Sequence, residues 1–255
     1  MPQLLRKVLW WVCLLVAPAV LLGIELFHPA NFTVDPGMFQ YLRMREPYSA
    51  AHKALAYPGP KWWFVLHMIQ TPMIALVAVG LFLMASRVRP VDWWVARTAA
   101  YLSVVATFVF AVYYTVLDAI GGVGLGRTIE IVNRLAASSQ LSPTQVLGVR
   151  AVLNGTWTDH WVGGVGSVVS QTGSWAVFSA ALLLAIGLLL SKRAPWPPLI
   201  GLVAFGYVLQ LTHAMPYGPI AFGLLIISAG WIRLWADRHD APDGTAERAP
   251  VGSPR

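Results

Sequence analysis

The sequence predicts an all-α polytopic membrane protein, and three observations lead to that fold class. Of the 255 residues, 57% are hydrophobic and only 11% are charged, whereas soluble domains carry about 25% charged residues. Several apolar segments of about 20 residues match the hydrocarbon core of a bilayer, which is about 30 Å thick. The net charge of +7 does not indicate a partner nucleic acid, because the basic residues lie at the ends of the apolar segments.

Six transmembrane helices are predicted, and together they form one domain over residues 1–236. The spans cover about 8–28, 62–86, 95–120, 166–191, 196–213 and 217–235. Trp62, Trp63, Trp93 and Trp94 lie at the ends of these spans. Indole rings favour the headgroup layer, so these residues support the predicted boundaries. The polar segment 237–255 is rich in Pro and Gly, which predicts a disordered cytoplasmic tail.

The basic residues predict how the bundle is oriented. Arg6 and Lys7 precede the first span, and Arg193 lies between the fourth and the fifth. The positive-inside rule therefore places both termini in the cytoplasm, as in a multi-pass protein of the inner (cell) membrane. The long connections 29–61 and 121–165 are then outside. A cleavable signal peptide ending at "APA" 17–19 is the alternative, but the apolar segment continues to Phe27, which favours a membrane span.

Polar side chains gather at the outer ends of five spans. The five sets are Glu25 and His28; His67, Gln70 and Thr71; Thr115 and Asp118; Ser167, Ser170, Gln171 and Ser174; Gln210 and His213. Ionisable groups within a bilayer are costly, and they usually mark function or face a cavity. Any one of them can instead snorkel or end a helix, as His28 does if Pro29 terminates its span. Since the sets lie at matching depth, we expect them to line one pocket open to the outside.

The second outer connection is predicted to be folded. Apolar residues at 129, 132 and 135 indicate an amphipathic helix, and Ser142, Pro143 and Gln145 give the start of another. Asn154 and Gly155 are its predicted end. A similar short helix is expected in the first outer connection. The glycines of 118–126 and 158–166 are interpreted as tight turns and as places of close helix approach.

Seven side chains form the predicted site: Glu25, His28, His67, Asp118, Asp159, His160 and His213. Imidazoles combined with carboxylates suit zinc, iron or copper, and the expected metal ligands are His28, His67, Asp118 and His213. The expected catalytic groups, which orient a ligand or move a proton, are Glu25, Asp118, Asp159 and His160. In a second interpretation, the pocket holds b-type haem, with His67 and His213 as the axial ligands that bind this cofactor.

Several functions are compatible with this pocket. A bound metal or haem predicts a membrane hydrolase or oxidoreductase that acts on a lipid-like or small hydrophobic substrate. The alternative is a non-catalytic transporter, ligand-binding protein or assembly protein that uses the same pocket. The inner halves of the spans offer no ionisable residue to complete a transport route, which disfavours transport. Whether the pocket is catalytic is left open, and the expected partner of the chain is the lipid bilayer itself.

Overall fold

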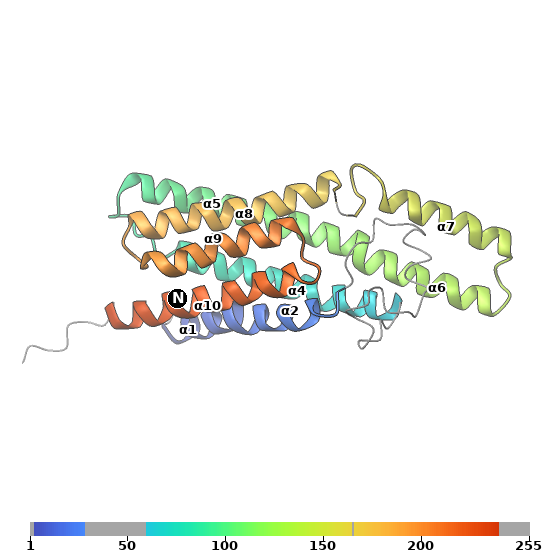
Figure 1. The fold of residues 1–255 in the computed structure, drawn as a ribbon, viewed down its shortest axis with the longest axis horizontal. Coiled ribbons are helices and arrows are strands. Elements are labelled where there is room, and N and C mark those ends of the chain that lie inside the picture. The colour runs from blue at the N-terminus through green and yellow to red at the C-terminus, as the bar shows by residue number, and fades with distance from the viewer. Residues whose placement is uncertain (1–2, 29–59, 165, 240–255) are drawn as a thin grey trace, which may run out of the picture.

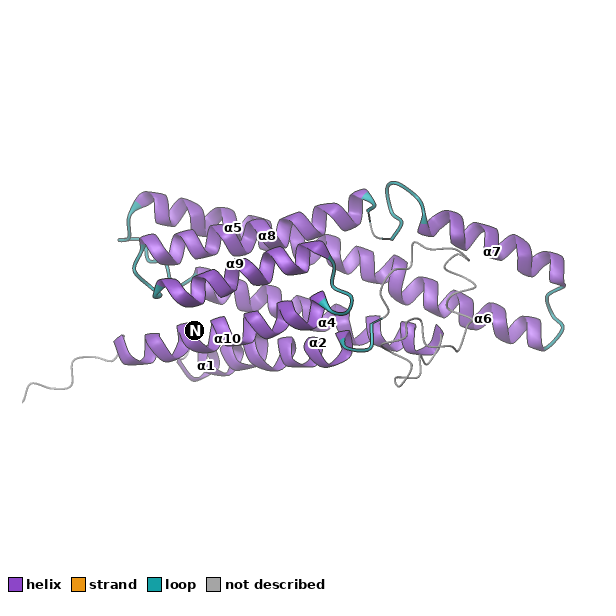
Figure 2. Ribbon diagram, in the orientation of Figure 1, coloured by secondary structure: helices purple, strands orange, loops and turns teal. Residues whose placement is uncertain are grey.

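The computed structural model describes residues 3–28, 60–164 and 166–239, and the regular structure in these ranges is helical throughout (Figures 1 and 2). Five helices are long and apolar enough to cross a membrane: Leu4–Glu25, Lys61–Ala85, Trp94–Ala137, Val168–Leu190 and Tyr217–His239. A shorter apolar helix, α9, covers Trp196–Leu211. The all-α class is therefore confirmed, and the five long apolar helices support a membrane-embedded protein. The short helix predicted in the first outer connection lies outside the described residues.

The helical segments have the following bounds. The first membrane helix consists of α1 (Gln3–Trp11), the π-helical η1 (Val12–Val16) and α2 (Ala17–Glu25). It is followed by α4 (Pro60–Ala85), α5 (Trp94–Leu117), the π-helical η3 (Asp118–Gly124), α6 (Leu125–Ala137), α7 (Pro143–Trp157), α8 (Val168–Leu190), α9 and α10 (Tyr217–His239).

The helices pack as a ring in chain order. α2 contacts α4, α4 contacts α5, α5 contacts α8, α8 contacts α9 and α9 contacts α10, and α10 closes the ring against α2. The connections between α4 and α5, α8 and α9, and α9 and α10 are short, so these neighbours run antiparallel. α1 begins and α10 ends at the same end of the bundle, and α6 and α7 project beyond the opposite end (Figure 1). We call these the inner and the outer end.

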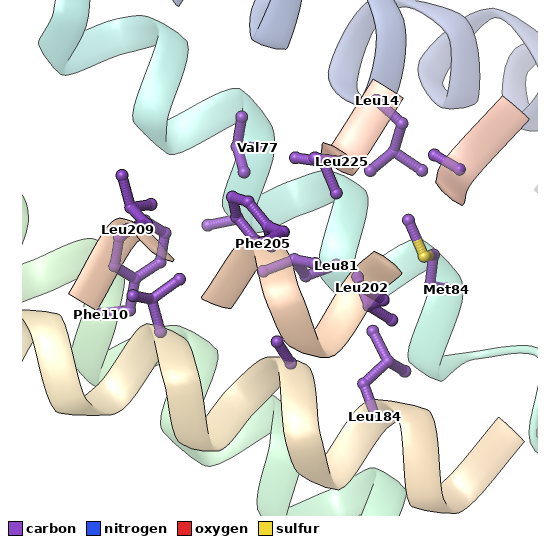
Figure 3. Packing of buried hydrophobic residues seen from close by; sticks show 14 of the residues in the cluster. Leu14, Val77, Leu81, Met84, Phe110, Leu184, Leu202, Phe205, Leu209 and Leu225 are labelled. Carbon is purple, nitrogen blue, oxygen red and sulfur yellow. The ribbon is translucent and has the colours of Figure 1, made fainter. Parts of the chain in front are cut away.

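The interior of the bundle is an apolar core, to which every helix of the ring contributes. Figure 3 shows Leu14 of η1, Val77 of α4 and Phe205 of α9 among the buried side chains. Lipid tails are as apolar as these residues, so close packing and small residues have to hold the helices together. α8 illustrates this, because Gly187 lies against the backbone of Ala96 in α5.

The structure corrects the expected end of the third span. The prediction ended this helix near 120 and interpreted the glycines of 118–126 as a turn. Instead α5 passes through η3 into α6, and Trp94–Ala137 is one continuous helix of 44 residues. The glycines still serve close approach, since Gly126 packs against the backbone of Phe64 in α4. In the segment 158–166 the turn is confirmed, and Gly166 has φ +95°.

Two other boundaries differ from the prediction. The start of α7 is confirmed, because Ser142 and Gln145 form the expected capping box. The helix does not end at Asn154 and Gly155 but continues to Trp157, since an isolated glycine lowers helix propensity without ending a helix. α10 extends to His239, three residues beyond the predicted end of the domain at 236, and residues 240–255 lie outside the described chain.

An ion pair joins the two short connections at the inner end of the bundle. Arg193, just after α8, places Nη2 3.1 Å from Oδ1 of Asp92, just before α5. Asp92 Oδ2 also accepts a hydrogen bond from the Arg89 amide, at 2.6 Å. Burial alone would raise the pKa of Asp92, but the hydrogen bonds from Arg193 and from the Arg89 amide outweigh it and lower the pKa.

We expect Asp92→Asn to reduce the free energy of unfolding by about 1 kcal/mol at pH 7, because a partly buried ion pair is lost. The carboxylate has a lower pKa when folded, so its contribution is present above its ordinary pKa of 3.8 and is lost as the pH falls through the folded value. Denaturation of the detergent-solubilised protein at pH 7 and at pH 3 measures this difference. An equal loss of stability at both pH values would contradict the assignment.

Candidate metal centre

Three imidazoles from separate parts of the chain meet near the outer end of the bundle. His28 follows α2, His67 lies in α4 and His213 follows α9. One ring nitrogen of each lies within 4.8 Å of the others. The His28 ring centroid is 5.4 Å from that of His67 and 4.7 Å from that of His213. The convergence expected from the sequence is therefore present for these three residues.

Each histidine is positioned by its own local structure. The His28 amide donates to the carbonyl of Glu25 at 3.1 Å, so His28 lies in the turn that ends the first membrane helix. His213 lies in the connection between α9 and α10, where the Thr212 hydroxyl accepts a hydrogen bond from the Ala214 amide. Gly218, at the start of α10, leaves room for the carbonyl of His213, which a Cβ at this position would contact.

His67 is oriented by a hydrogen bond within its own helix. Its Nδ1 lies 2.8 Å from the carbonyl oxygen of Trp63, one turn earlier in α4. A carbonyl oxygen only accepts, so Nδ1 carries the hydrogen and Nε2 keeps its lone pair. Metal-binding histidines show this arrangement, in which the second ring nitrogen donates to a carbonyl or a carboxylate and fixes the ring.

The π-helical segment η3 creates the space for the His67 ring. A Cβ on Gly122 would collide with that ring, so α4 and η3 approach closely only because this residue is a glycine. The neighbouring carbonyl of Gly121 accepts a hydrogen bond from Trp63 Nε1 at 3.0 Å. Isolated π-helical turns change the register of backbone hydrogen bonds and occur frequently at functional sites.

Two buried carboxylates lie next to the histidines. Asp118 is 1% exposed and Glu25 is fully buried. The two are close enough to interact electrostatically. Thr71 Oγ1 is 3.5 Å from Asp118 Oδ2, whereas Asp118 Oδ1 and both Glu25 oxygens have no hydrogen-bond partner within the described residues. A buried carboxylate without a partner is costly, so this arrangement favours a cation or a proton beside the histidines.

A cavity of about 420 Å³ opens at this place. The three histidines and Asp118 line it, together with the aromatic rings of Trp63, Trp157 and Tyr217. Glu25 is buried behind these lining residues. Trp157 closes part of the cavity from α7, where its ring lies against Gly164 and has its centroid 6.3 Å from that of Trp63. The cavity therefore combines a few polar groups with large apolar walls, as ligand sites commonly do.

Asp159 and His160 are not brought to this cluster. Both are exposed, and neither lines the cavity. Asp159 Oδ1 accepts hydrogen bonds from the amides of Trp161 and Val162 at 2.8 and 2.9 Å, and these bonds lower its pKa. The carboxylate thus stabilises the turn before α8. The His160 ring contacts the ring of Trp161 instead of the other imidazoles.

The remaining predicted polar residues are not part of the histidine cluster. Some of them have a structural role, and for others the described contacts show no role. Ser167 is the N-cap of α8, accepting a hydrogen bond from the Ser170 amide at 3.2 Å. Gln171 is exposed. Gln70 lies one turn deeper than His67 in α4, fully buried, and its amide group has no hydrogen-bond partner within the described chain.

Sequence reasoning missed Trp63 as part of the site and interpreted it as a headgroup anchor. The indole is 1% exposed and binds the backbone of η3. The spacing of four residues between Trp63 and His67 places both on one helix face, and this was the available signal. Gly122 gave no signal of this kind, because its role depends on which helix lies opposite.

Comparisons with known proteins give no family for this chain. No protein-family model matches it, and no curated protein or solved structure shows significant similarity. The function therefore has to be argued from the geometry of the site.

We expect Gly122→Ala to displace the His67 ring and to reduce the free energy of unfolding by about 1–3 kcal/mol, because the added methyl group overpacks the contact. Gly230→Ala in α10 is the matched control. Its Cβ would meet nothing within 4 Å, and alanine is favoured over glycine in a helix by about 1 kcal/mol. Thermal unfolding of both variants in detergent measures the difference. Equal stability of the two variants would contradict the close approach at Gly122.

Proposed function

We propose that this protein binds one transition-metal ion in the outer cavity, with His28, His67 and His213 as ligands. The observation that carries the proposal is the convergence of three imidazole nitrogens to within 4.8 Å of one another. An ion that bonds each nitrogen at about 2.0–2.1 Å in tetrahedral geometry holds them about 3.4 Å apart. Small rotations of the three side chains cover this difference.

The carboxylates support a divalent cation. Three neutral imidazoles leave the charge of a divalent ion uncompensated, and Asp118 and Glu25 supply two negative charges when ionised. Within the described residues neither takes part in a salt bridge. Asp118, which lines the cavity, is the proposed fourth ligand, and Glu25, behind the lining, is the proposed orienting or proton-accepting group.

A single ion fits this geometry better than haem. A haem held by His67 and His213 needs its macrocycle between the two axial imidazoles. The His28 ring lies close to both of these imidazoles: its centroid is 4.7 Å from that of His213 and 5.4 Å from that of His67. A macrocycle there would have to displace His28. We therefore propose a site for a single zinc, iron or copper ion instead of a b-type haem site.

The proposed activity is metal-assisted chemistry on a small hydrophobic or lipid-like molecule. A transition-metal ion supplies Lewis acidity and an activated water. The chain supplies the rest: Trp63, Trp157 and Tyr217 give apolar walls that hold the substrate and exclude bulk water. Asp118 and Glu25 are placed to take up a proton. Hydrolysis of an ester or amide is the reaction that these groups support most directly, and an oxidoreductase would require a redox-active ion.

Non-catalytic use of the cavity is the second candidate, and transport is its less supported form. Between the cavity and the inner end, the bundle is filled by apolar side chains that include Val77, Phe110 and Leu209 (Figure 3). A transported ion would have to cross this core, in which the described chain offers no carboxylate or imidazole ligand.

We further propose that α9 is a sixth span and that both termini face the cytoplasm. α9 has 16 residues, and the ring of helices is incomplete without it. Arg6, Arg89 and Arg193 all belong to the inner end, as the positive-inside rule requires. In this arrangement α6 and α7 project outside the membrane and the metal centre lies near the outer surface.

We expect purified wild-type protein to carry about one equivalent of zinc, iron or copper, and His67→Ala to lose most of it, because one of three imidazole ligands is removed. Elemental analysis after passage through a chelating resin measures the content. His239→Ala is the matched control. His239 makes the same hydrogen bond from Nδ1 to a backbone carbonyl one turn earlier, at 2.8 Å, but it is exposed and remote from the cluster.

Four results would contradict the proposal. Wild-type protein without metal after reconstitution with each ion excludes the centre, as does equal metal content in wild type and His67→Ala. A Soret band that disappears in His213→Ala would replace the single ion by haem. Uptake of the bound metal into proteoliposomes by wild type, but not by His67→Ala, would replace catalysis by transport.

The orientation is tested by cysteine labelling in a Cys13→Ala background, since Cys13 is the chain's one cysteine. Gln140→Cys, between α6 and α7, should react with a membrane-impermeant maleimide in intact cells. Val91→Cys, 88% exposed at the inner end, should react only after the membrane is permeabilised. The reverse pattern would overturn the orientation without affecting the metal centre.

A further inference from the structure

A second pocket lies at the inner end of the bundle, remote from the metal centre. It has a volume of about 170 Å³ and lies between the end of α4 and the start of α5. Its cationic lining residues are Arg89 and Arg97, and Ser86 adds a hydroxyl group. Arg6 extends the cationic rim, because its Nη2 donates to Ser86 Oγ at 3.2 Å. Three guanidinium groups thus lie at or beside one small pocket.

Within the described residues, Arg89 and Arg97 form no salt bridge with a carboxylate. The salt bridges of the described chain join Arg127 to Glu130, Arg193 to Asp92 and Arg233 to Asp237. Arg97 takes part in none of these pairs, and its Nε is buried without a hydrogen-bond partner within the described residues. Asp92, the acid closest in sequence, accepts a hydrogen bond from the backbone amide of Arg89 and forms its ion pair with Arg193, and the Arg89 charge contributes a weaker attraction.

On the side of the arginines that faces the middle of the bundle, the pocket is apolar. It continues onto the exposed face of α5. Phe82 and Val104 line this apolar part of the pocket. Tyr101 and Phe108 of α5 are 66% and 63% exposed, so they belong to the surface that faces lipid in a membrane. Trp94 is 67% exposed, and an exposed indole at the start of a membrane helix indicates the headgroup layer. The guanidinium groups therefore lie at headgroup depth and the apolar surface at acyl-chain depth.

We propose that this pocket binds the phosphate-bearing headgroup of an anionic phospholipid. Arg89 and Arg97 provide charge-assisted hydrogen bonds to the phosphate oxygens, for which the planar guanidinium is well shaped. One acyl chain then lies along Tyr101, Val104 and Phe108. Basic pockets between transmembrane helices on the cytoplasmic side are typical of anionic lipid sites. The inference is independent of the metal centre.

The experiment is a titration of the full-length protein in a neutral detergent with short-chain phosphatidylglycerol, phosphatidylcholine or inorganic phosphate. Binding is measured by native mass spectrometry and by thermal stabilisation. We expect phosphatidylglycerol to bind and to stabilise wild type more strongly than phosphatidylcholine does. Arg89→Gln and Arg97→Gln should each weaken this binding about fivefold, the effect of about 1 kcal/mol per basic residue near a membrane surface. Arg238→Gln, which removes an exposed charge from the end of α10, is the matched control and should bind like wild type.

Three outcomes would overturn the proposal. They are equal binding of phosphatidylglycerol and phosphatidylcholine, an equal effect of Arg97→Gln and Arg238→Gln, and full competition by inorganic phosphate at equal concentration. The last result would identify a site for free phosphate in place of a lipid site. Arg89 is exposed, so Arg89→Gln folds without repacking and keeps the test valid if Arg97→Gln is unstable.

Discussion

The contact between α4 and the π-helical segment η3 is the constraint on which the outer half of the structure depends. At this place the His67 ring lies directly against the backbone of Gly122, and the indole of Trp63 donates to the neighbouring carbonyl of Gly121. In a bilayer, helices gain little from burying apolar surface, so close backbone approach and buried hydrogen bonds determine how they pack. Here one contact supplies both the close approach and the hydrogen bond, and it also orients the His67 ring, whose Nε2 is the proposed metal ligand.

The same contact positions one of the two buried carboxylates beside the histidines. Asp118 is the first residue of η3, so the approach of η3 to α4 brings it beside Thr71 and the histidines. Glu25 reaches the same region from the end of α2. Neither residue has a salt-bridge partner within the described chain. A bound divalent cation would offset both charges, and this electrostatic requirement connects the imidazole cluster to the acids behind it.

The two ends of the bundle are organised differently. At the outer end three histidines and Asp118 line one cavity. At the inner end the basic groups join the connections, as Arg193 does with Asp92, or line a small pocket, as Arg89 and Arg97 do. Between the two ends lies an apolar core (Figure 3), which separates the histidine cluster from the inner end. This division favours chemistry at one surface over passage across the membrane.

The sequence by itself determined the all-helical class, most span positions and a set of candidate polar residues at the outer end. Composition and apolar length settle the class because a bilayer demands long apolar helices, and the capping box at Ser142 is readable because capping is local. Only the tertiary structure decided that His28, His67 and His213 converge whereas Asp159 and His160 do not. It also decided that the glycines after Asp118 continue a helix and that Trp63 is buried. These outcomes depend on which helix lies opposite, and a one-dimensional pattern does not contain that information.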